Sequence, residues 1–218
     1  MNIVKKIIIV LIGTFIIGLG IAFTTYSKLG QDCLAALVFS IHYLIDLPFF
    51  TYSVCYFIIN GIFCILVLIF SKDKIHIGSI LNFTLTGICV DLCIYLFSLI
   101  KMDTDIFVLR ALYSFIGISL ISLGIALYGS VNLGLAPYDA LPFIINKVFK
   151  KIKYSIGRMI VALVCIIVAF VIGVLILNRS DIININTLLA SVLLSVEIPI
   201  FSKMIHKNII KTDINIFN

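Results

Sequence analysis

Residues 12–41 read IGTFIIGLGIAFTTYSKLGQDCLAALVFSI, and residues 116–145 read IGISLISLGIALYGSVNLGLAPYDALPFII. Shifted by 104 residues, the two stretches are identical at 13 of 30 positions. Composition alone gives about two or three matches, because isoleucine and leucine dominate apolar segments. The shared residues include glycines and a Leu-Gly corner, Leu29-Gly30 and Leu133-Gly134. An internal repeat of this kind predicts a chain built from two similar halves.

The similarity continues beyond these stretches after a slip of four residues. Ser79-Ile80-Leu81 then lies near Thr187-Leu188-Leu189, and Asp91 lies near Glu197. We therefore divide a single transmembrane domain, residues 1–218, into two repeats at 7–101 and 111–205.

The composition is that of an integral membrane protein. Hydrophobic residues make up 62% of the 218 residues and charged residues 12%, with a mean hydropathy of +1.26. Soluble domains are nearer half apolar and a quarter charged. A water-soluble fold of this length could not bury so much apolar surface, whereas a bilayer solvates it directly. The composition therefore predicts an all-α membrane protein and argues against a soluble enzyme.

Long apolar runs mark the segments that could cross the bilayer. Each is long enough for a hydrocarbon core of about 30 Å at a rise of about 1.5 Å per residue. The six runs are 5–26, 50–70, 77–100, 106–129, 155–177 and 183–204. Two shorter segments, 30–45 and 135–149, are borderline for a full crossing.

The charged loops favour an inverted arrangement of the halves. The cations behind the net charge of +6 lie in short loops between apolar runs, which argues against nucleic-acid binding. The loop after the first short segment carries only Asp46, whereas its counterpart carries Lys147, Lys150, Lys151 and Lys153. Opposite sides of the membrane explain this difference if each half has three spans and one short re-entrant helix. Eight full spans remain the alternative, and both arrangements put the two termini in the cytoplasm.

The second corner carries a family resemblance. The stretch Asn132-Leu133-Gly134-Leu135-Ala136-Pro137-Tyr138-Asp139 follows a glycine-bearing helix and precedes Ser155-Ile156-Gly157. This pattern resembles the YczE/YitT-type bacterial integral membrane proteins over nearly the whole chain. The first corner departs from it, since Gln31-Asp32-Cys33 lacks the proline. The resemblance implies a multi-pass protein of the bacterial cytoplasmic membrane on the YczE side of the group, and it names no substrate.

Asp139 is the sharpest candidate for a functional residue, because it follows Gly134 and Pro137 at the start of a short helix. In one interpretation, its carboxylate caps or complements the helix N-terminus, where proline also fits. In the other, broken backbone at membrane depth lines a cavity, and the carboxylate binds a cation or proton. Gly30 is the counterpart of Gly134 in the first half. Asp32 is the first-half analogue of Asp139 in place, though not in register, and helix capping is favoured for it.

Asp91 and Glu197 are carboxylates within apolar runs, at nearly equivalent positions of the two halves. Such groups are costly in a bilayer and usually face the bundle interior. They therefore bind an ion or proton, or they form a structural polar pair, for example with Arg158. Arg158 itself lies just inside the run 155–177, and it is also interpreted as an interfacial residue that extends to the membrane surface.

Tyrosines near the span ends are expected to form an aromatic belt at the membrane surface. These are Tyr26, Tyr52, Tyr56, Tyr128, Tyr138 and Tyr154. The six cysteines lie in or beside apolar runs without a second metal-binding pair, so no metal and no cofactor are expected. Phosphate-binding, hydrolase and metalloprotease motifs are absent from the sequence, which argues against an enzyme.

Two functional hypotheses follow. The first is a secondary transporter or channel for a small solute or ion, which requires Asp91, Glu197 or Asp139 to converge on a cavity. The second is a membrane-embedded accessory or regulatory factor that acts through a membrane-protein partner or a second copy of itself. In both, the lipid bilayer is the surrounding partner.

Overall fold

A computed structural model describes residues 2–100, 106–149, 152–179 and 182–207. Over these ranges the elements are helices joined by loops, without a strand. The long apolar helices are α1 (Ile3–Ser27), α3 (Tyr52–Phe70), α4 (Ile77–Ile100), α5 (Phe107–Ser130), α7 (Tyr154–Phe170) and α8 (Ile185–Ile205). A π-helix, η2 (Val171–Ile176), extends α7, and a 3₁₀ turn, η1 (Lys72–Lys74), joins α3 to α4.

Six helices in the described part of the chain are long and apolar enough to cross a membrane. The two short helices are α2 (Cys33–Ile45) and α6 (Pro137–Val148), with 13 and 12 residues. At about 1.5 Å per residue, each reaches about 20 Å, which is too short for a hydrocarbon core of about 30 Å. The fold is therefore that of a multi-pass membrane protein with six long and two short helices, and eight full spans are wrong.

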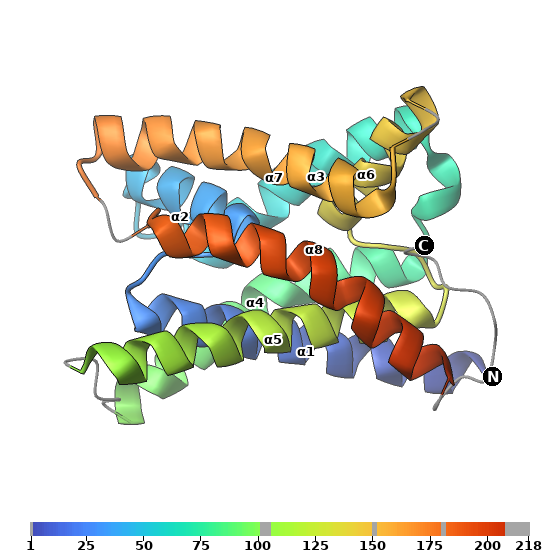
Figure 1. The fold of residues 1–218 in the computed structure, drawn as a ribbon, viewed down its shortest axis with the longest axis horizontal. Helices are drawn as coiled ribbons and strands as arrows, with labels where there is room; N and C mark the ends of the chain where they lie inside the picture. The colour runs from blue at the N-terminus through green and yellow to red at the C-terminus, as the bar shows by residue number, and fades with distance from the viewer. Residues whose placement is uncertain (1, 101–105, 150–151, 180–181, 208–218) are drawn as a thin grey trace.

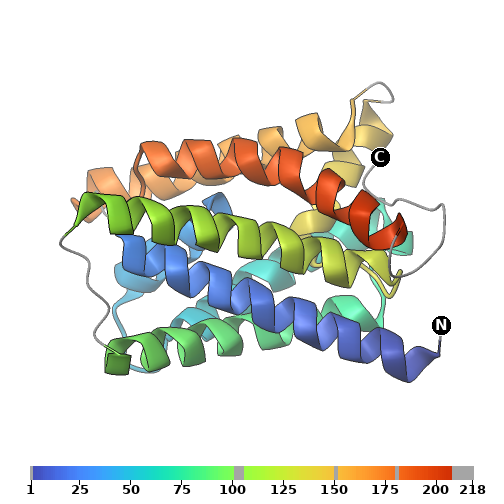
Figure 2. The same cartoon turned by 60° about the horizontal axis from the view of Figure 1, so that its bottom comes forward.

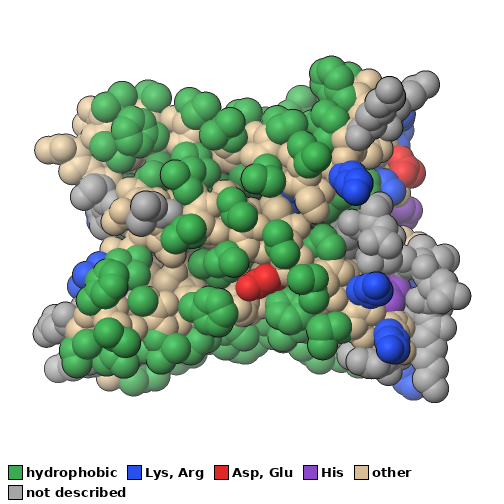
Figure 3. Space-filling model, in the orientation of Figure 1, with side chains coloured by type: hydrophobic (Ala, Val, Ile, Leu, Met, Phe, Trp, Pro, Cys, Tyr) green, Lys and Arg blue, Asp and Glu red, His purple; other side chains and the backbone are tan. Residues whose placement is uncertain are grey.

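The two ends of the bundle differ in charge. The start of α1 and the end of α8 lie at one end, as two views of the ribbon agree (Figures 1 and 2). Lys, Arg and His side chains gather at this end in the space-filling view, and the face between the ends is mostly apolar (Figure 3). Lys147 lies at this end, where its Nζ donates to the carbonyl oxygen of Phe70 at 2.8 Å. Lys150 and Lys151 lie outside the described residues.

Glycines bring α1 and α5 into close contact at two places. A Cβ atom added to Gly13 would lie 2.8 Å from the carbonyl oxygen of Gly124, and one added to Gly20 would lie 2.6 Å from that of Gly117. Such small residues let backbones approach closely in membrane helix packing. As residue numbers increase along α1, the numbers of the contacting residues on α5 decrease, so the two helices are antiparallel. Under the 104-residue shift, Gly13 corresponds to Gly117 and Gly20 to Gly124. The two contacts are therefore the same contact with the roles of the halves exchanged.

The two Leu-Gly corners are held in the same reciprocal way. Gly30 has a φ of 108°, and an added Cβ would lie 2.7 Å from the hydroxyl oxygen of Thr187, at the start of α8. Gly134 has a φ of 98°, and an added Cβ would meet the hydroxyl of Ser79, at the start of α4. Side chains other than glycine rarely adopt such φ values. Each corner therefore requires glycine and packs on a helix of the other half.

Backbone hydrogen bonds repeat this exchange. The N–H of Gln31 donates to the carbonyl oxygen of Ile182 at 3.1 Å, and the N–H of Leu135 donates to that of Lys74 at 2.9 Å. Contacts that recur with the partners exchanged are the mark of a two-fold axis. Because α1 and α5 are antiparallel, this axis runs across the helices. The repeat bounds 7–101 and 111–205 stay a prediction.

We predict that Gly117→Ala destabilises the protein. The new methyl group would lie 2.7 Å from the carbonyl oxygen of Gly20, so α1 and α5 must separate. Overpacking of this kind costs about 1–3 kcal/mol. The measurement is the thermal unfolding midpoint of the purified protein in detergent. Gly61→Ala in α3 is the matched control, since nothing lies within 4 Å of its added Cβ. Equal midpoints for the two variants would contradict the prediction.

Candidate functional site

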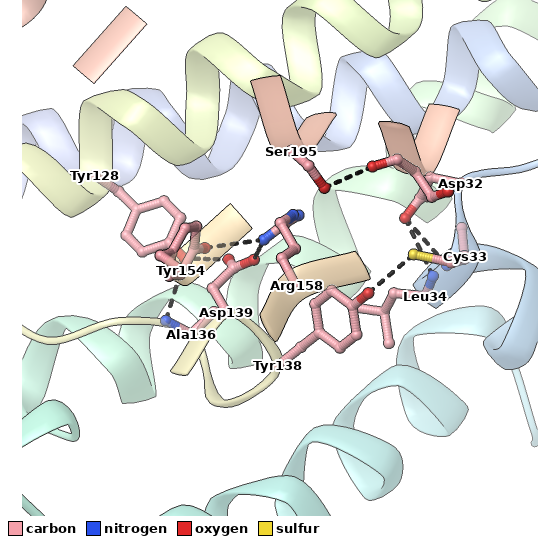
Figure 4. Close-up of polar contacts among 12 residues, drawn as sticks. Asp32, Cys33, Leu34, Tyr128, Ala136, Tyr138, Asp139, Tyr154, Arg158 and Ser195 are labelled. Atoms are coloured by element: carbon pink, nitrogen blue, oxygen red, sulfur yellow. Dashed lines mark hydrogen bonds and ion pairs between the residues drawn. The ribbon is translucent and has the colours of Figure 1, made fainter. Parts of the chain in front are cut away.

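The first turns of α2 and α6 meet inside the bundle, where the two halves join (Figure 4). The sulfur of Cys33 and the hydroxyl oxygen of Tyr138 lie 2.9 Å apart, and either can donate the hydrogen bond. Both side chains are buried. Each helix starts just after its Leu-Gly corner, so two helix N-termini, with their partial positive charge, lie in the interior.

A buried ion pair stands beside this meeting point. Nη1 of Arg158, on α7, donates to Oδ1 of Asp139 at 2.5 Å, and the two side chains are 4% and 6% exposed. The same Nη1 donates to the hydroxyl oxygen of Tyr154 at 3.2 Å. The hydroxyl of Tyr128 donates to the second carboxylate oxygen of Asp139 and accepts from the N–H of Ala136. Both oxygens of Asp139 therefore have donors, as a buried charge requires.

This geometry corrects two interpretations. Arg158 does not extend to the membrane surface, because Asp139 compensates its charge inside the bundle. Asp139 does not cap α6, because the cap position is Ala136, but it lies in the first turn, where its charge complements the helix N-terminus as predicted. Pro137 occupies the first turn of α6, as predicted. The guanidinium carbon of Arg158 also lies 5.5 Å from the centre of the Tyr138 ring, within cation–π range.

Asp32 caps α2, as predicted. Its Oδ2 accepts hydrogen bonds from the N–H groups of Leu34 at 3.2 Å and Ala35 at 3.5 Å. Its other oxygen, Oδ1, is buried and has no hydrogen-bond partner among the described residues. The residue is 6% exposed, so bulk solvent does not satisfy this oxygen.

A small cavity of about 30 Å³ is lined by Asp32 and by both members of the ion pair. This volume has room for a water molecule or a small ion. Isoleucines from the middle of α1 and α5 form its apolar wall. The first half contributes Asp32, Tyr56 and Asn82 to its polar wall, and the second half contributes Tyr138, Asp139 and Arg158.

Asp91 and Glu197 do not line this cavity. Asp91, on α4, accepts from the backbone N–H of Ser53 at 3.2 Å, in the first turn of α3. Glu197, on α8, accepts from the hydroxyl of Ser122 on α5 at 2.7 Å. Both carboxylates are half-buried. Pairing of either with Arg158 is wrong, because the guanidinium is engaged by the carboxylate of α6.

Sequence reasoning missed the tyrosines of the site. The aromatic-belt interpretation is wrong for the five buried tyrosines, which are Tyr52, Tyr56, Tyr128, Tyr138 and Tyr154. One signal was present, since Tyr154 precedes Arg158 by four residues and therefore shares its helix face. Tyr128 contacts Asp139 and Tyr138 contacts Cys33 only because of how the Leu-Gly corners place α2 and α6. No spacing along one helix indicates these contacts.

Fold and site together define a multi-pass helical membrane protein with a buried ion pair between α6 and α7. The chain belongs to DUF6198, a family of unknown function whose model matches residues 4–203. The match covers the whole candidate site. No curated protein and no solved structure matches the chain.

We predict that Asp139 and Arg158 are energetically coupled. Asp139→Asn or Arg158→Gln alone leaves the other buried charge without its contacting partner, which costs about 3–5 kcal/mol. The double variant removes both charges, so its loss should be smaller than the sum of the two single losses. The measurement is a double-mutant cycle of unfolding free energies in detergent. The exposed pair Asp73–Lys74 is the control, since such pairs contribute little. Additive losses at 139 and 158 would contradict the prediction.

Proposed function

We propose that this protein is a secondary carrier for a small charged solute or ion, with its binding site at the cavity between α2 and α6. The observation that carries the proposal is one small cavity that is lined by an acid–base pair and a second carboxylate, where the N-termini of the two short helices meet. Carriers with inverted repeats commonly bind substrate at such a place, where short helices end near the repeat interface.

The buried charges support a functional role more than a stabilising one. A buried ion pair is weak evidence for stability, because its desolvation offsets most of its attraction. Ionisable groups inside a membrane bundle mark solute or ion pathways and proton relays. Arg158 and the helix N-termini favour an anionic group, whereas Asp32 and Asp139 favour a cationic one. A solute bearing charge therefore fits the cavity better than an apolar one.

The reciprocal contacts support alternating access. Each contact that the first half makes with the second at the glycines and corners has a matching contact made by the second half with the first. The two halves can therefore tilt against each other in two equivalent directions. The cavity of about 30 Å³ corresponds to a closed state, and tilting would open it to either side. A solute larger than a water molecule requires this movement.

The charges at the two ends support cytoplasmic termini in a bacterial cytoplasmic membrane. Cytoplasmic loops carry the excess of lysine and arginine. The end with the start of α1 also carries Lys72, Lys74 and Lys147, whereas Asp46 follows α2 at the other end. The short helices would then enter the membrane from opposite sides.

This orientation predicts the pattern of chemical labelling. In a background without the six native cysteines, Asp46→Cys should react with an impermeant reagent from outside the cell. Lys72→Cys should react only after the membrane is permeabilised. Labelling of position 72 in intact cells would contradict the orientation.

Transport in proteoliposomes tests the carrier itself. We expect uptake of at least one member of a panel of small anions, cations and zwitterions. Asp139→Asn and Arg158→Lys should lower that uptake at least about tenfold, since misplacing a binding group costs about 1.4 kcal/mol or more. Asp91→Asn and Glu197→Gln are matched controls, because they change carboxylates at membrane depth that do not line the cavity.

Two outcomes would contradict the proposal. In one, the control variants lose uptake as fully as the cavity variants do. In the other, no solute is taken up and cavity variants keep full activity in cells. The second outcome favours an accessory or regulatory factor that acts through a protein partner.

A further inference from the structure

The charges around the cavity do not balance. Three charged side chains line it: Asp32, Asp139 and Arg158. Arg158 compensates Asp139 at 2.5 Å, and the lining contains no second basic side chain for Asp32. Figure 4 shows the Arg158 side chain between Asp139 on one side and Asp32 on the other. With all three ionised, the cavity carries one net negative charge in a region of low dielectric, which is strongly unfavourable.

Hydrogen bonding does not remove the imbalance at Asp32. The two N–H groups at the start of α2 both reach Oδ2, while Oδ1 has no partner among the described residues. A helix N-terminus supplies only about half a positive charge. A buried carboxylate oxygen without a donor or a cation is costly, and native structures rarely keep one.

The other ionisable groups near Asp32 do not supply the missing charge. They are Cys33 on its own helix, Tyr52 and Tyr56 of α3, Tyr138 of α6 and Cys165 of α7. Tyrosine and cysteine side chains are neutral near pH 7, so they add no positive charge. The walls from α1, α4 and α5 consist of isoleucines and Asn82, which are uncharged.

We infer that the cavity binds one additional positive charge, a proton or a small monovalent cation, at the carboxylate of Asp32. A proton would make the carboxyl group neutral and so remove the excess negative charge. A cation would occupy the cavity of about 30 Å³ beside the carboxylate. The inference deepens the proposed carrier function, because a bound proton or cation couples solute movement to an ion gradient.

Binding is measured on the purified full chain in detergent, without any solute. Thermal unfolding midpoints are recorded from mildly acidic to mildly alkaline pH in choline chloride. At the alkaline end, sodium chloride then replaces choline chloride at constant ionic strength. If a proton binds, the midpoint falls as pH rises, because the folded protein holds one proton more than the unfolded protein. If sodium binds, it raises the midpoint at alkaline pH by mass action.

Asp32→Asn should abolish this dependence. Asparagine is also a good N-cap, so α2 keeps its cap while the charge is lost. Asp46→Asn is the matched control, since it makes the same change at the exposed C-terminal end of the same helix. The control should keep the wild-type response to pH or sodium.

Asp139→Asn tests the charge balance itself. It leaves one acid, Asp32, and one base, Arg158, in the cavity, so the need for an added cation disappears although Asp32 is intact. The response should therefore shrink in this variant as well. A wild-type midpoint whose response to pH and sodium equals that of Asp32→Asn would overturn the inference.

The inference and the carrier function can fail separately. If the unfolding midpoint responds through Asp32 but the protein moves no solute, the binding site is supported and the carrier function is contradicted. If the protein takes up solute but its midpoint shows no such response, the carrier function is supported and the binding site is contradicted.

Discussion

The close antiparallel packing of α1 and α5 is the contact on which the other features rest. At Gly13 and Gly20, the backbone of α1 lies so near α5 that no side chain fits between them. Membrane helices gain little from burying apolar surface against each other, so close packing must supply the attraction. Because the contact joins the two halves along their first helices, it sets the axis that relates them. Isoleucines between and beside the glycine contacts then form the apolar wall of the cavity.

A second constraint acts where the chain leaves α1 and α5. Backbone polar groups inside a membrane need partners within the protein, and a corner followed by a short helix exposes several of them. Each corner finds these partners on the other half, as the bonds of Gln31 and Leu135 show. Neither half can therefore complete its own short helix alone. The site lies at the joint between the halves for the same reason, since the two short helices start there.

The ion pair was only partly predictable. Asp139 was identified because a carboxylate after a Leu-Gly corner and a proline is unusual in an apolar chain. Its partner Arg158 was a candidate too, but its position near a span end suggested the membrane surface. Asp91 and Glu197 satisfied the same rule for buried carboxylates, yet they bind hydroxyl and N–H groups away from the cavity. The sequence shows how far along a membrane helix a residue lies. Which neighbouring helix its side chain faces depends on how the helices pack.

The sequence by itself indicated the six long helices, the two short ones and the similarity between two stretches 104 residues apart. Lipid requires long apolar runs, and φ values of 108° at Gly30 and 98° at Gly134 favour glycine, so both leave a mark in the residue order. Only the tertiary structure decided which charges meet. The partners of Asp139, Tyr128 on α5 and Arg158 on α7, lie 11 and 19 residues away in the chain, and Asp32 of the other half lines the same cavity. These residues lie on different helices, so their contacts depend on how the helices pack, and no periodicity within one helix records them.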